Sequence, residues 1–219
     1  MRTVIAGGAG QIAQRLERLL RSRGDTPLGL IRSPQKADLV QEAGAEPLVC
    51  DLESASVEEV SELLRGADAA VFAAGAGPGS GEARKETVDR AAAELFTDAS
   101  ARAGVRRLLV VSAMGVDGEP PAEADPVFAT YLRAKGAADA AVRARTDLDW
   151  TILRPGRLTD DPGTGRVELA AHTGRSEVTR DDVAAVLLAL LDEPLSVGHT
   201  LELVNGDVPV AEAVAAAVR

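Results

Sequence analysis

The chain begins MRTVIAGGAGQIA, residues 1–13, and the rest of the sequence is organised around this stretch. Residues 3–6 form a short apolar run with β-branched side chains, long enough for one buried strand. Small residues follow at the spacing Gly7-x-x-Gly10-x-x-Ala13, where a helical pattern begins. This order is either a plain tight turn or a dinucleotide site, because glycine lets backbone approach a phosphate that the helix N-terminus attracts. We favour the dinucleotide site, and the residues expected to contact the cofactor here are Gly7, Gly10, Gln11 and Ile12.

Composition and charge narrow the class of protein. A chain of 219 residues with 46% hydrophobic residues can build one globular core, although only 2% of its residues are aromatic. The formal net charge of -10 argues against nucleic acid as a partner, because such a footprint needs clustered Lys and Arg. Cys50 is the single cysteine, which excludes an internal disulfide and a cysteine-built metal site and is typical of a reducing cytoplasm.

The sequence does not suggest a membrane or metal protein. No apolar run approaches the length of a membrane span, and the start of the chain does not resemble a secretory leader. The two histidines, His172 and His199, lack metal-ligand spacing. We therefore expect a cytoplasmic protein with no membrane partner and no metal.

Strand-like and helix-like segments alternate along the chain. The expected strands cover residues 3–6, 28–31, 47–50, 69–74, 107–111, 150–153 and 200–204. The expected helices cover residues 11–23, 34–44, 56–65, 83–103, 127–145, 179–191 and 210–218. This α/β pattern predicts a single Rossmann-fold domain over residues 1–219, in which a doubly wound parallel sheet binds ligands at the carboxyl ends of its strands.

The remaining segments are irregular. Residues 75–81 and 117–126 are rich in Gly or Pro and are expected to be loops. Residues 157–177 are turn-rich as well, with one short strand expected at 167–169. The segments at about 156–179 and 195–219 are expected to form a small C-terminal substrate region within the domain.

Arg32 follows the second expected strand, about 20 residues beyond the glycine turn, where the cofactor's ribose is expected. An acidic residue there would bind the 2′-hydroxyl of NAD, whereas Arg32, backed by the hydroxyl of Ser33, suits the 2′-phosphate of NADP. The alternative is a solvated arginine beside a helix cap. The pattern favours NADP(H) over NAD(H).

Two further strand ends add candidate cofactor contacts. Asp51 ends the third expected strand, where its carboxylate would accept a hydrogen bond from the adenine amino group or would only close a turn. Ala73, Ala74 and Gly75 end the fourth expected strand. Small residues there would let the middle of the cofactor lie against backbone, although turns also favour them.

Tyr131 and Lys135 form the sharpest local pattern, because residues four apart lie on one face of a helix. A cation beside a phenol favours phenolate, so this spacing predicts a Tyr131 pKa below its ordinary value of about 10. Tyr131 would then exchange a proton with a carbonyl or an alcohol, and Lys135 would also reach the nicotinamide ribose. The alternative is an exposed pair on a surface helix.

The roles of two more polar residues, Ser112 and His172, remain open. Ser112, at the end of the fifth expected strand, would orient a substrate carbonyl toward Tyr131 or would bond only to backbone. His172 lies in the irregular segment, where it would fold over the site or would simply be solvated.

These motifs resemble a known family. The ones that carry the resemblance are Gly7-x-x-Gly10-x-x-Ala13, Asp51-Leu52, Ala73-Ala74-Gly75, Val111-Ser112, Tyr131-x-x-x-Lys135 and Leu153-Arg154-Pro155-Gly156. Their order is that of short-chain dehydrogenase/reductases, and the stretch TRDDVA at 179–184 is similar to the atypical NAD(P)H-binding, NmrA-like branch. The resemblance implies a Rossmann fold that binds NADP(H), with a Tyr/Lys pair for proton transfer, Leu52 beside the cofactor and Pro155 near the nicotinamide.

Three functions are compatible with this resemblance. The first is an NADP(H)-dependent oxidoreductase that reduces a small carbonyl, quinone or flavin substrate through Tyr131, Lys135 and Ser112. The second is a non-catalytic NADP(H) sensor of the NmrA type, which would bind a partner protein. The third is an epimerase or dehydratase of nucleotide sugars, which normally needs a larger C-terminal domain than the roughly 65 residues after Pro155 provide. The oligomeric state, monomer or homodimer, stays open.

Overall fold

The computed structural model describes residues 1–77, 79–120 and 123–219. Pro78, Pro121 and Ala122 belong to the two segments expected to be loops and lie outside the described residues. The strands are β1 (Arg2–Ala6), β2 (Thr26–Ile31), β3 (Glu46–Val49), β4 (Ala69–Phe72), β5 (Arg107–Val111), β6 (Asp149–Pro155), β7 (Arg157–Thr159), β8 (Arg166–Ala170), β9 (Glu177–Thr179), β10 (His199–Asn205) and β11 (Val208–Pro209).

The helices alternate with these strands, as the sequence predicts. They are α1 (Gln11–Ser22), η1 (Pro34–Lys36), α2 (Ala37–Glu42), α3 (Val57–Leu64), α4 (Glu82–Arg84), η2 (Lys85–Ala91), α5 (Ala92–Ala103), α6 (Pro126–Arg143), α7 (Arg180–Leu191), η3 (Pro194–Ser196) and α8 (Val210–Ala217). Side chains cap several of them: Ser56 and Glu59 form a capping box on α3, and Thr179 accepts from the Asp182 backbone at the start of α7.

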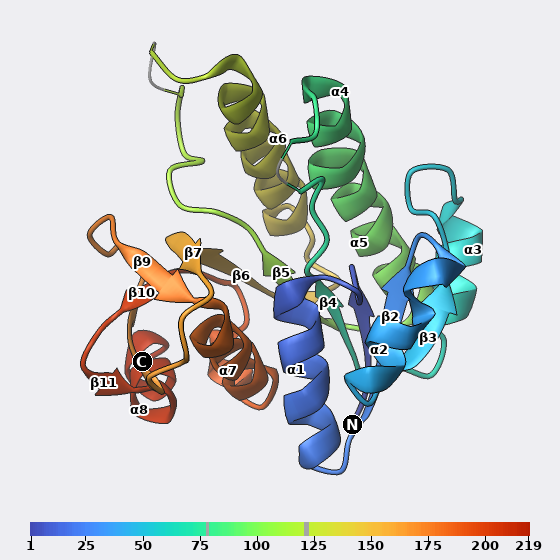
Figure 1. Cartoon of the computed structure of the whole chain (residues 1–219), viewed down its shortest axis with the longest axis horizontal. Coiled ribbons are helices and arrows are strands. Elements are labelled where there is room, and N and C mark those ends of the chain that lie inside the picture. The colour runs from blue at the N-terminus through green and yellow to red at the C-terminus, as the bar shows by residue number, and fades with distance from the viewer. Residues whose placement is uncertain (78, 121–122) are drawn as a thin grey trace.

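Within the described residues, nine strands form one sheet in the order β3-β2-β1-β4-β5-β6-β10-β8-β11. The strands from β3 to β10 pair in parallel, whereas β8 runs antiparallel to β10 and β11 antiparallel to β8. Helices cover both faces, with α5 and α6 on one side and α1 and α7 on the other (Figure 1). The predicted α/β Rossmann-like fold is therefore confirmed, with an antiparallel edge that the sequence analysis did not anticipate.

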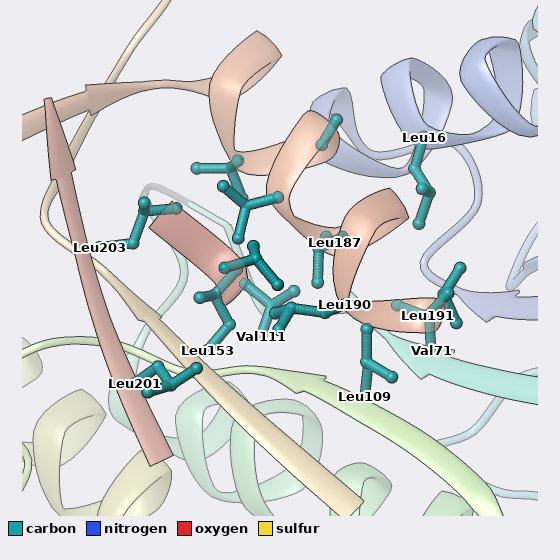
Figure 2. Packing of buried hydrophobic residues seen from close by; sticks show 14 of the residues in the cluster. Leu16, Val71, Leu109, Val111, Leu153, Leu187, Leu190, Leu191, Leu201 and Leu203 are labelled. Carbon is teal, nitrogen blue, oxygen red and sulfur yellow. The ribbon is translucent and has the colours of Figure 1, made fainter. Parts of the chain in front are cut away.

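Two hydrophobic clusters hold the layers together. One joins the sheet to α1, α7 and α8, and Figure 2 shows Leu16 of α1 and Leu187 and Leu190 of α7 packed against Val71, Leu109 and Leu153 of the strands. The other fills the opposite face between the sheet and α3, α5 and α6, with Phe72 and Phe96 at its centre. The core is built mostly from Ala, Val and Leu, as expected from the scarcity of aromatic residues.

The order of the strands sets the position of the ligand site. From β1 the chain moves outward to β2 and β3, then crosses back to place β4 on the other side of β1. Where the connections after two adjacent parallel strands run to opposite sides of the sheet, a crevice is left at the carboxyl ends of those strands. Ala6 and Phe72, the last residues of β1 and β4, lie opposite each other in the register, so the segments that follow them meet there.

Four local expectations need correction. The fourth strand ends at Phe72, so Ala73 and Ala74 belong to the loop after it. The helix expected at 83–103 is divided into α4, the π-helical segment η2 and α5. The segment at 34–44 is a 3-10 turn followed by a short α-helix. Finally, β7 and β9 pair in a separate two-stranded parallel sheet within the region expected to be mostly irregular.

One acidic side chain is buried beneath the glycine turn. Glu17 of α1 is completely buried, and neither carboxyl oxygen has a hydrogen-bond partner among the described residues. The carboxyl lies between Gly8 and Gly29, because a side-chain carbon built on either glycine would come within 3.0 or 2.5 Å of Glu17 Oε1, respectively. Burial raises the pKa of Glu17 to about 8, against a smaller lowering by Arg18.

Candidate functional site

Three adjoining hollows form a groove across the carboxyl ends of the parallel strands. The first shares Gly10 and the segment after β4 with the second, and the second shares Phe128, Tyr131 and Leu158 with the third. We call them the adenosine hollow, the central hollow and the substrate hollow, in that order. Every residue that the sequence analysis assigned to cofactor binding or catalysis lines at least one of the three.

The glycine turn forms the junction between the first two hollows. Gly7 has φ +82°, and a side chain on it would come within 2.7 Å of the Ala74 backbone. Gly10 begins α1 without a side-chain cap, and the first turn of the helix holds no acidic residue. The helix N-terminus therefore faces the groove with no side chain filling it, which is the arrangement that binds an anion.

Gly8 has a separate role that the spacing Gly7-x-x-Gly10 did not reveal. A side chain on Gly8 would come within 2.5 Å of the Gly29 backbone on β2. The absence of a side chain at Gly8 therefore lets the turn pack directly on the neighbouring strand. The backbone N–H groups of Gly7 and Gly8 both donate to the Leu30 carbonyl, at 3.1 and 2.9 Å, which fixes the turn.

The adenosine hollow brings the predicted ribose and adenine contacts together. Its lining includes the predicted residues Gly7, Gly10, Arg32, Ser33, Asp51, Leu52, Ala73, Ala74 and Gly75, and also Lys36, Cys50 and Glu53. Arg32 Nη1 donates to Glu53 Oε2 at 2.9 Å, and about half of the Arg32 side chain is exposed. Glu53 also accepts from Arg84 and Thr87, and these three hydrogen bonds help keep its pKa below the usual value. The Ser33 hydroxyl bonds with the Gln35 side chain.

The central hollow gathers the predicted catalytic residues. Its lining includes Gln11, Ile12, Ser112, Tyr131 and Lys135. Ser112 is buried at the carboxyl end of β5, and its backbone N–H donates to the Leu153 carbonyl at 2.8 Å. Its hydroxyl makes no hydrogen bond of good geometry within the described residues. An unpartnered buried hydroxyl that lines a groove is suited to bind a ligand atom.

Lys135 is held away from solvent by two acceptors. Its ammonium donates to the Val111 carbonyl at 2.9 Å and lies 3.8 Å from Asp89 Oδ1. A second lysine, Lys85 of η2, lies 3.9 Å from Asp89 Oδ2 and donates to the Gly77 carbonyl at 3.1 Å. Burial lowers the pKa of Lys135 and raises that of Asp89, and their mutual attraction opposes both shifts. Asp89 thus anchors two of the chain's three lysines at this hollow.

The predicted lowering of the Tyr131 pKa is wrong for this structure. Burial raises the pKa of Tyr131 above its ordinary value, and the negative charges of Asp89 and Asp139 raise it further. The lysine over the Tyr131 ring is Lys85, whose ammonium lies 5.2 Å from the ring centroid. The four-residue spacing placed Tyr131 and Lys135 on one helical face, but burial and two carboxylates outweigh the effect of a cation whose ammonium is bound elsewhere.

Arg154 and Asp139 form a buried ion pair behind the catalytic candidates. Asp139 continues the face of α6 that carries Tyr131 and Lys135, at the same four-residue interval. The Arg154 guanidinium, 3% exposed, donates to Asp139 Oδ2 from Nε at 2.9 Å and also binds Asp117 through two nitrogens. Burial raises the pKa of Asp139, and the hydrogen-bonded Arg154 guanidinium opposes that rise.

The substrate hollow lies beyond Tyr131 and has a volume of about 780 Å³, in the range of small-molecule sites. Its lining comes from the segment after β5, from α6, and from the segments around β7 and β9. Pro155 and Tyr131 both line it. Of the predicted substrate-side segments, residues 156–158 and 175–177 take part, whereas none of the residues 195–219 lines any of the three hollows.

His172 does not take part in the groove. Its side chain is 83% exposed, and its Nδ1 lies 4.0 Å from Glu202 Oε1. It lines none of the three hollows, so His172 is a solvated side chain and does not fold over the site. Within the described ranges 1–77, 79–120 and 123–219, no group of three or more His, Cys, Asp or Glu side chains is arranged to hold a metal ion.

Sequence reasoning missed the partners of the predicted residues. Glu53, Lys85 and Asp89 come from segments with no recognised motif, and Phe128 and Arg175 come from segments interpreted as a helix face and as turns. One signal was present: Lys85 and Asp89 stand four apart, so they share a helical face in a chain with few lysines.

Comparisons with known proteins show the family to which this chain belongs. The model of a family described as NAD(P)H-binding matches residues 7–194. An uncharacterized sugar epimerase of Bacillus subtilis, YhfK, is 35% identical over 214 residues, which cover 97% of this chain and 98% of YhfK. The chain belongs to the NAD(P)H-binding family, which confirms the family expected from the sequence.

Two solved structures resemble this one along almost their whole length. A Bacillus halodurans protein provisionally named an NAD-dependent epimerase/dehydratase has a TM-score of 0.89 and 33% identity and covers 99% of both chains. The oxidoreductase YlbE of Lactococcus lactis has a TM-score of 0.86 and 26% identity, and the match covers 99% of this chain and 96% of YlbE.

Among the described residues, no helix is both long enough and apolar enough to cross a membrane.

Proposed function

We propose that this protein is an NADP(H)-dependent reductase of a small carbonyl, quinone or flavin substrate. The observation that carries the proposal is the continuity of the groove. A basic ribose end at Arg32, then a glycine turn with an uncapped helix N-terminus, and then a hollow lined by the catalytic candidates Ser112, Tyr131 and Lys135 follow one another along it. A dinucleotide laid along this groove would bring its nicotinamide end to these three side chains and to the substrate hollow beyond them.

The residues of the groove fit the cofactor. The turn at Gly7 and Gly10 requires glycine, because a side-chain carbon at either position would come within 3.0 Å of backbone atoms, and the turn leads into an uncapped helix N-terminus suited to a pyrophosphate. Lys135, held by Val111 and Asp89, would donate to ribose hydroxyls, and Ser112 would donate its unpartnered hydroxyl to the substrate carbonyl. When bound, NADPH supplies a hydride to the carbonyl carbon.

Tyr131 is proposed as the proton donor to the carbonyl oxygen. With its pKa raised above the ordinary value, Tyr131 stays protonated through the neutral range, so it can give the phenolic proton as negative charge develops on that oxygen. The proton would be replaced from solvent after the alcohol leaves. At neutral pH the phenolate form of Tyr131, which would have to accept a proton from an alcohol, is therefore scarcely populated.

Replacing Tyr131 with phenylalanine is expected to lower kcat for a carbonyl substrate by roughly 10²-fold or more, since the variant has no proton to donate. The measurement is NADPH consumption with a panel of carbonyls, quinones and flavins. Flavin reduction should survive the change, because a flavin can take its proton from water. NADPH affinity serves as the control and should stay within about twofold, so that a loss of rate reports proton transfer. Unchanged carbonyl turnover would exclude this role for Tyr131.

We further propose that Arg32 gives the protein its preference for NADP(H) over NAD(H). Replacing Arg32 with alanine should weaken NADPH binding by roughly 10- to 100-fold and leave NADH binding nearly unchanged, as expected for the loss of one charge-assisted pair with a phosphate. Equilibrium titration of both cofactors checks this. Glu53→Gln is the matched variant: it removes the carboxylate that holds Arg32, so it should strengthen NADPH binding. Equal affinity of the wild type for the two cofactors would contradict the proposal.

The names of the relatives favour one second candidate. Proteins named as a sugar epimerase and as an epimerase/dehydratase align with the whole chain, so epimerisation of a nucleotide sugar is the alternative to reduction. An epimerase would convert its sugar with no net consumption of added cofactor, whereas the reductase must consume NADPH. The short substrate-side segments support the reductase.

We propose the cytoplasm as the location of this protein, supported by the single cysteine.

A further inference from the structure

The substrate hollow has one flat aromatic wall. The rings of Phe128 and Tyr131 are stacked, with centroids 6.0 Å apart and planes inclined by 26°. Phe128 is nevertheless 51% exposed. The sequence contains only five aromatic residues, and two of them stand together at this hollow. An exposed aromatic ring beside a hollow marks a surface that gains from covering by a flat apolar partner.

The rest of the lining is apolar apart from a few side chains. The apolar members are Ala113, Met114, Leu132, Pro155 and Leu158. The charged members are Arg157, Arg175 and Glu177, and Arg157 pairs with Glu177 across β7 and β9. This pair cancels its own charge and leaves Arg175 as the uncompensated charge of the lining.

The guanidinium of Arg175 is available to bind an anionic ligand. It is exposed, and among residues 1–77, 79–120 and 123–219 it forms neither an ion pair nor a side-chain hydrogen bond. Its guanidinium lies against the backbone of Gly115, where a side-chain carbon would come within 3.2 Å of an Arg175 nitrogen. Within the described part of the chain, Arg175 therefore places a positive charge with no acidic partner at the edge of an apolar hollow.

On the basis of the proposed reductase, we propose that its substrate is a flat, apolar molecule that carries an anionic group. The rings of the substrate cover Phe128 and Tyr131, and its carboxylate, sulfonate or phosphate binds Arg175. The guanidinium fork matches such groups with two parallel hydrogen bonds. The anion therefore fixes which end of the substrate faces Tyr131.

A pair of fluorescent dyes tests the site without turnover. 8-Anilino-1-naphthalenesulfonate and N-phenyl-1-naphthylamine share the same rings and differ only in the sulfonate. We expect Arg175→Gln, titrated with NADP⁺ present, to weaken binding of the sulfonate dye by about tenfold or more and to change binding of the neutral dye by less than about twofold. Arg157→Gln is the matched control, because Glu177 already engages that arginine, and it should affect the sulfonate dye much less. Phe128→Ala should weaken binding of both dyes, which locates them against the stacked rings of Phe128 and Tyr131.

The outcomes separate this inference from the proposed function. Equal effects of Arg175→Gln on both dyes, or no effect on the sulfonate dye, would overturn the anion site. In a second measurement, NADPH oxidation is followed with 1,4-naphthoquinone-2-sulfonate and with 1,4-naphthoquinone. The inference expects Arg175→Gln to raise the KM of the sulfonate relative to that of the parent quinone. If no acceptor is reduced by the wild type while the dyes still discriminate, the reductase proposal fails and the anion site stands.

Discussion

Replacing Arg154 with methionine is expected to lower the free energy of unfolding by about 3–5 kcal/mol, because removing one member of a buried ion pair leaves the other charge without compensation. Asp139 is completely buried, and Arg154 is the cation that bonds to it. Part of the cost will be avoided if Asp139 takes up a proton, since the loss of Arg154 would raise its pKa further. Urea denaturation measures the change.

The double variant Arg154→Met, Asp139→Asn separates a charge effect from a packing effect. If the unpaired carboxylate causes the loss, this variant should recover at least about half of it, because an amide costs less to bury than a carboxylate. Asp117→Asn is the exposed control and should cost about 1 kcal/mol or less, since more than half of that side chain is in solvent. A destabilisation by Arg154→Met of under about 1 kcal/mol would contradict the role of the pair.

The second large effect concerns Glu17, whose replacement by glutamine should stabilise the protein at neutral pH. The folded-state pKa of about 8 lies above the ordinary value of 4.5, so the folded protein holds a proton that the unfolded chain releases. The contribution of Glu17 to stability is therefore fully present below pH 4.5 and falls as the pH rises toward 8. At pH 7 the difference amounts to roughly 3 kcal/mol, at about 1.4 kcal/mol per pH unit.

Urea denaturation at a series of pH values between 4.5 and 8 checks this expectation. The free energy of unfolding of the wild type should fall along the series relative to that of Glu17→Gln, and the two curves should approach each other at the acidic end. Glu58→Gln, on the outer surface of α3, provides a control that removes an exposed carboxyl instead. Parallel curves for the wild type and Glu17→Gln would mean that Glu17 is not buried as a neutral acid.

The order of the main elements could be predicted from the sequence because it depends on local signals. The apolar run before Gly7, the cap at Ser56 and the alternation of strands with helices each act over a few residues. The short strands β7 and β9 could not be found this way. Each holds only three residues, and their pairing depends on the chain folding back through the 17 intervening residues 160–176.

The candidate site was predictable in its backbone but not in its electrostatics. Gly7, Arg32 and Lys135 follow from strand ends and spacing, which fix where a residue stands. The carboxylates that control these residues are distant in sequence: Glu53 reaches Arg32, and Asp89 reaches Lys135. Burial also cannot be derived from spacing, and for this reason the Tyr131 pKa moves in the direction opposite to the prediction.

The groove has a consequence for the modularity of the chain. The adenosine hollow is lined entirely by residues from Gly7 to Ala92, whereas the substrate hollow is lined entirely by residues from Ala113 to Glu177. On the proposed function, the adenosine end of the cofactor and the substrate are therefore recognised by consecutive, non-overlapping parts of the polypeptide, whereas the central hollow between them draws on both parts. A library of variants restricted to positions in the second part can search for new acceptors while the nucleotide pocket keeps its own residues. Chimaeras between relatives, joined along β5, provide the same separation by recombination.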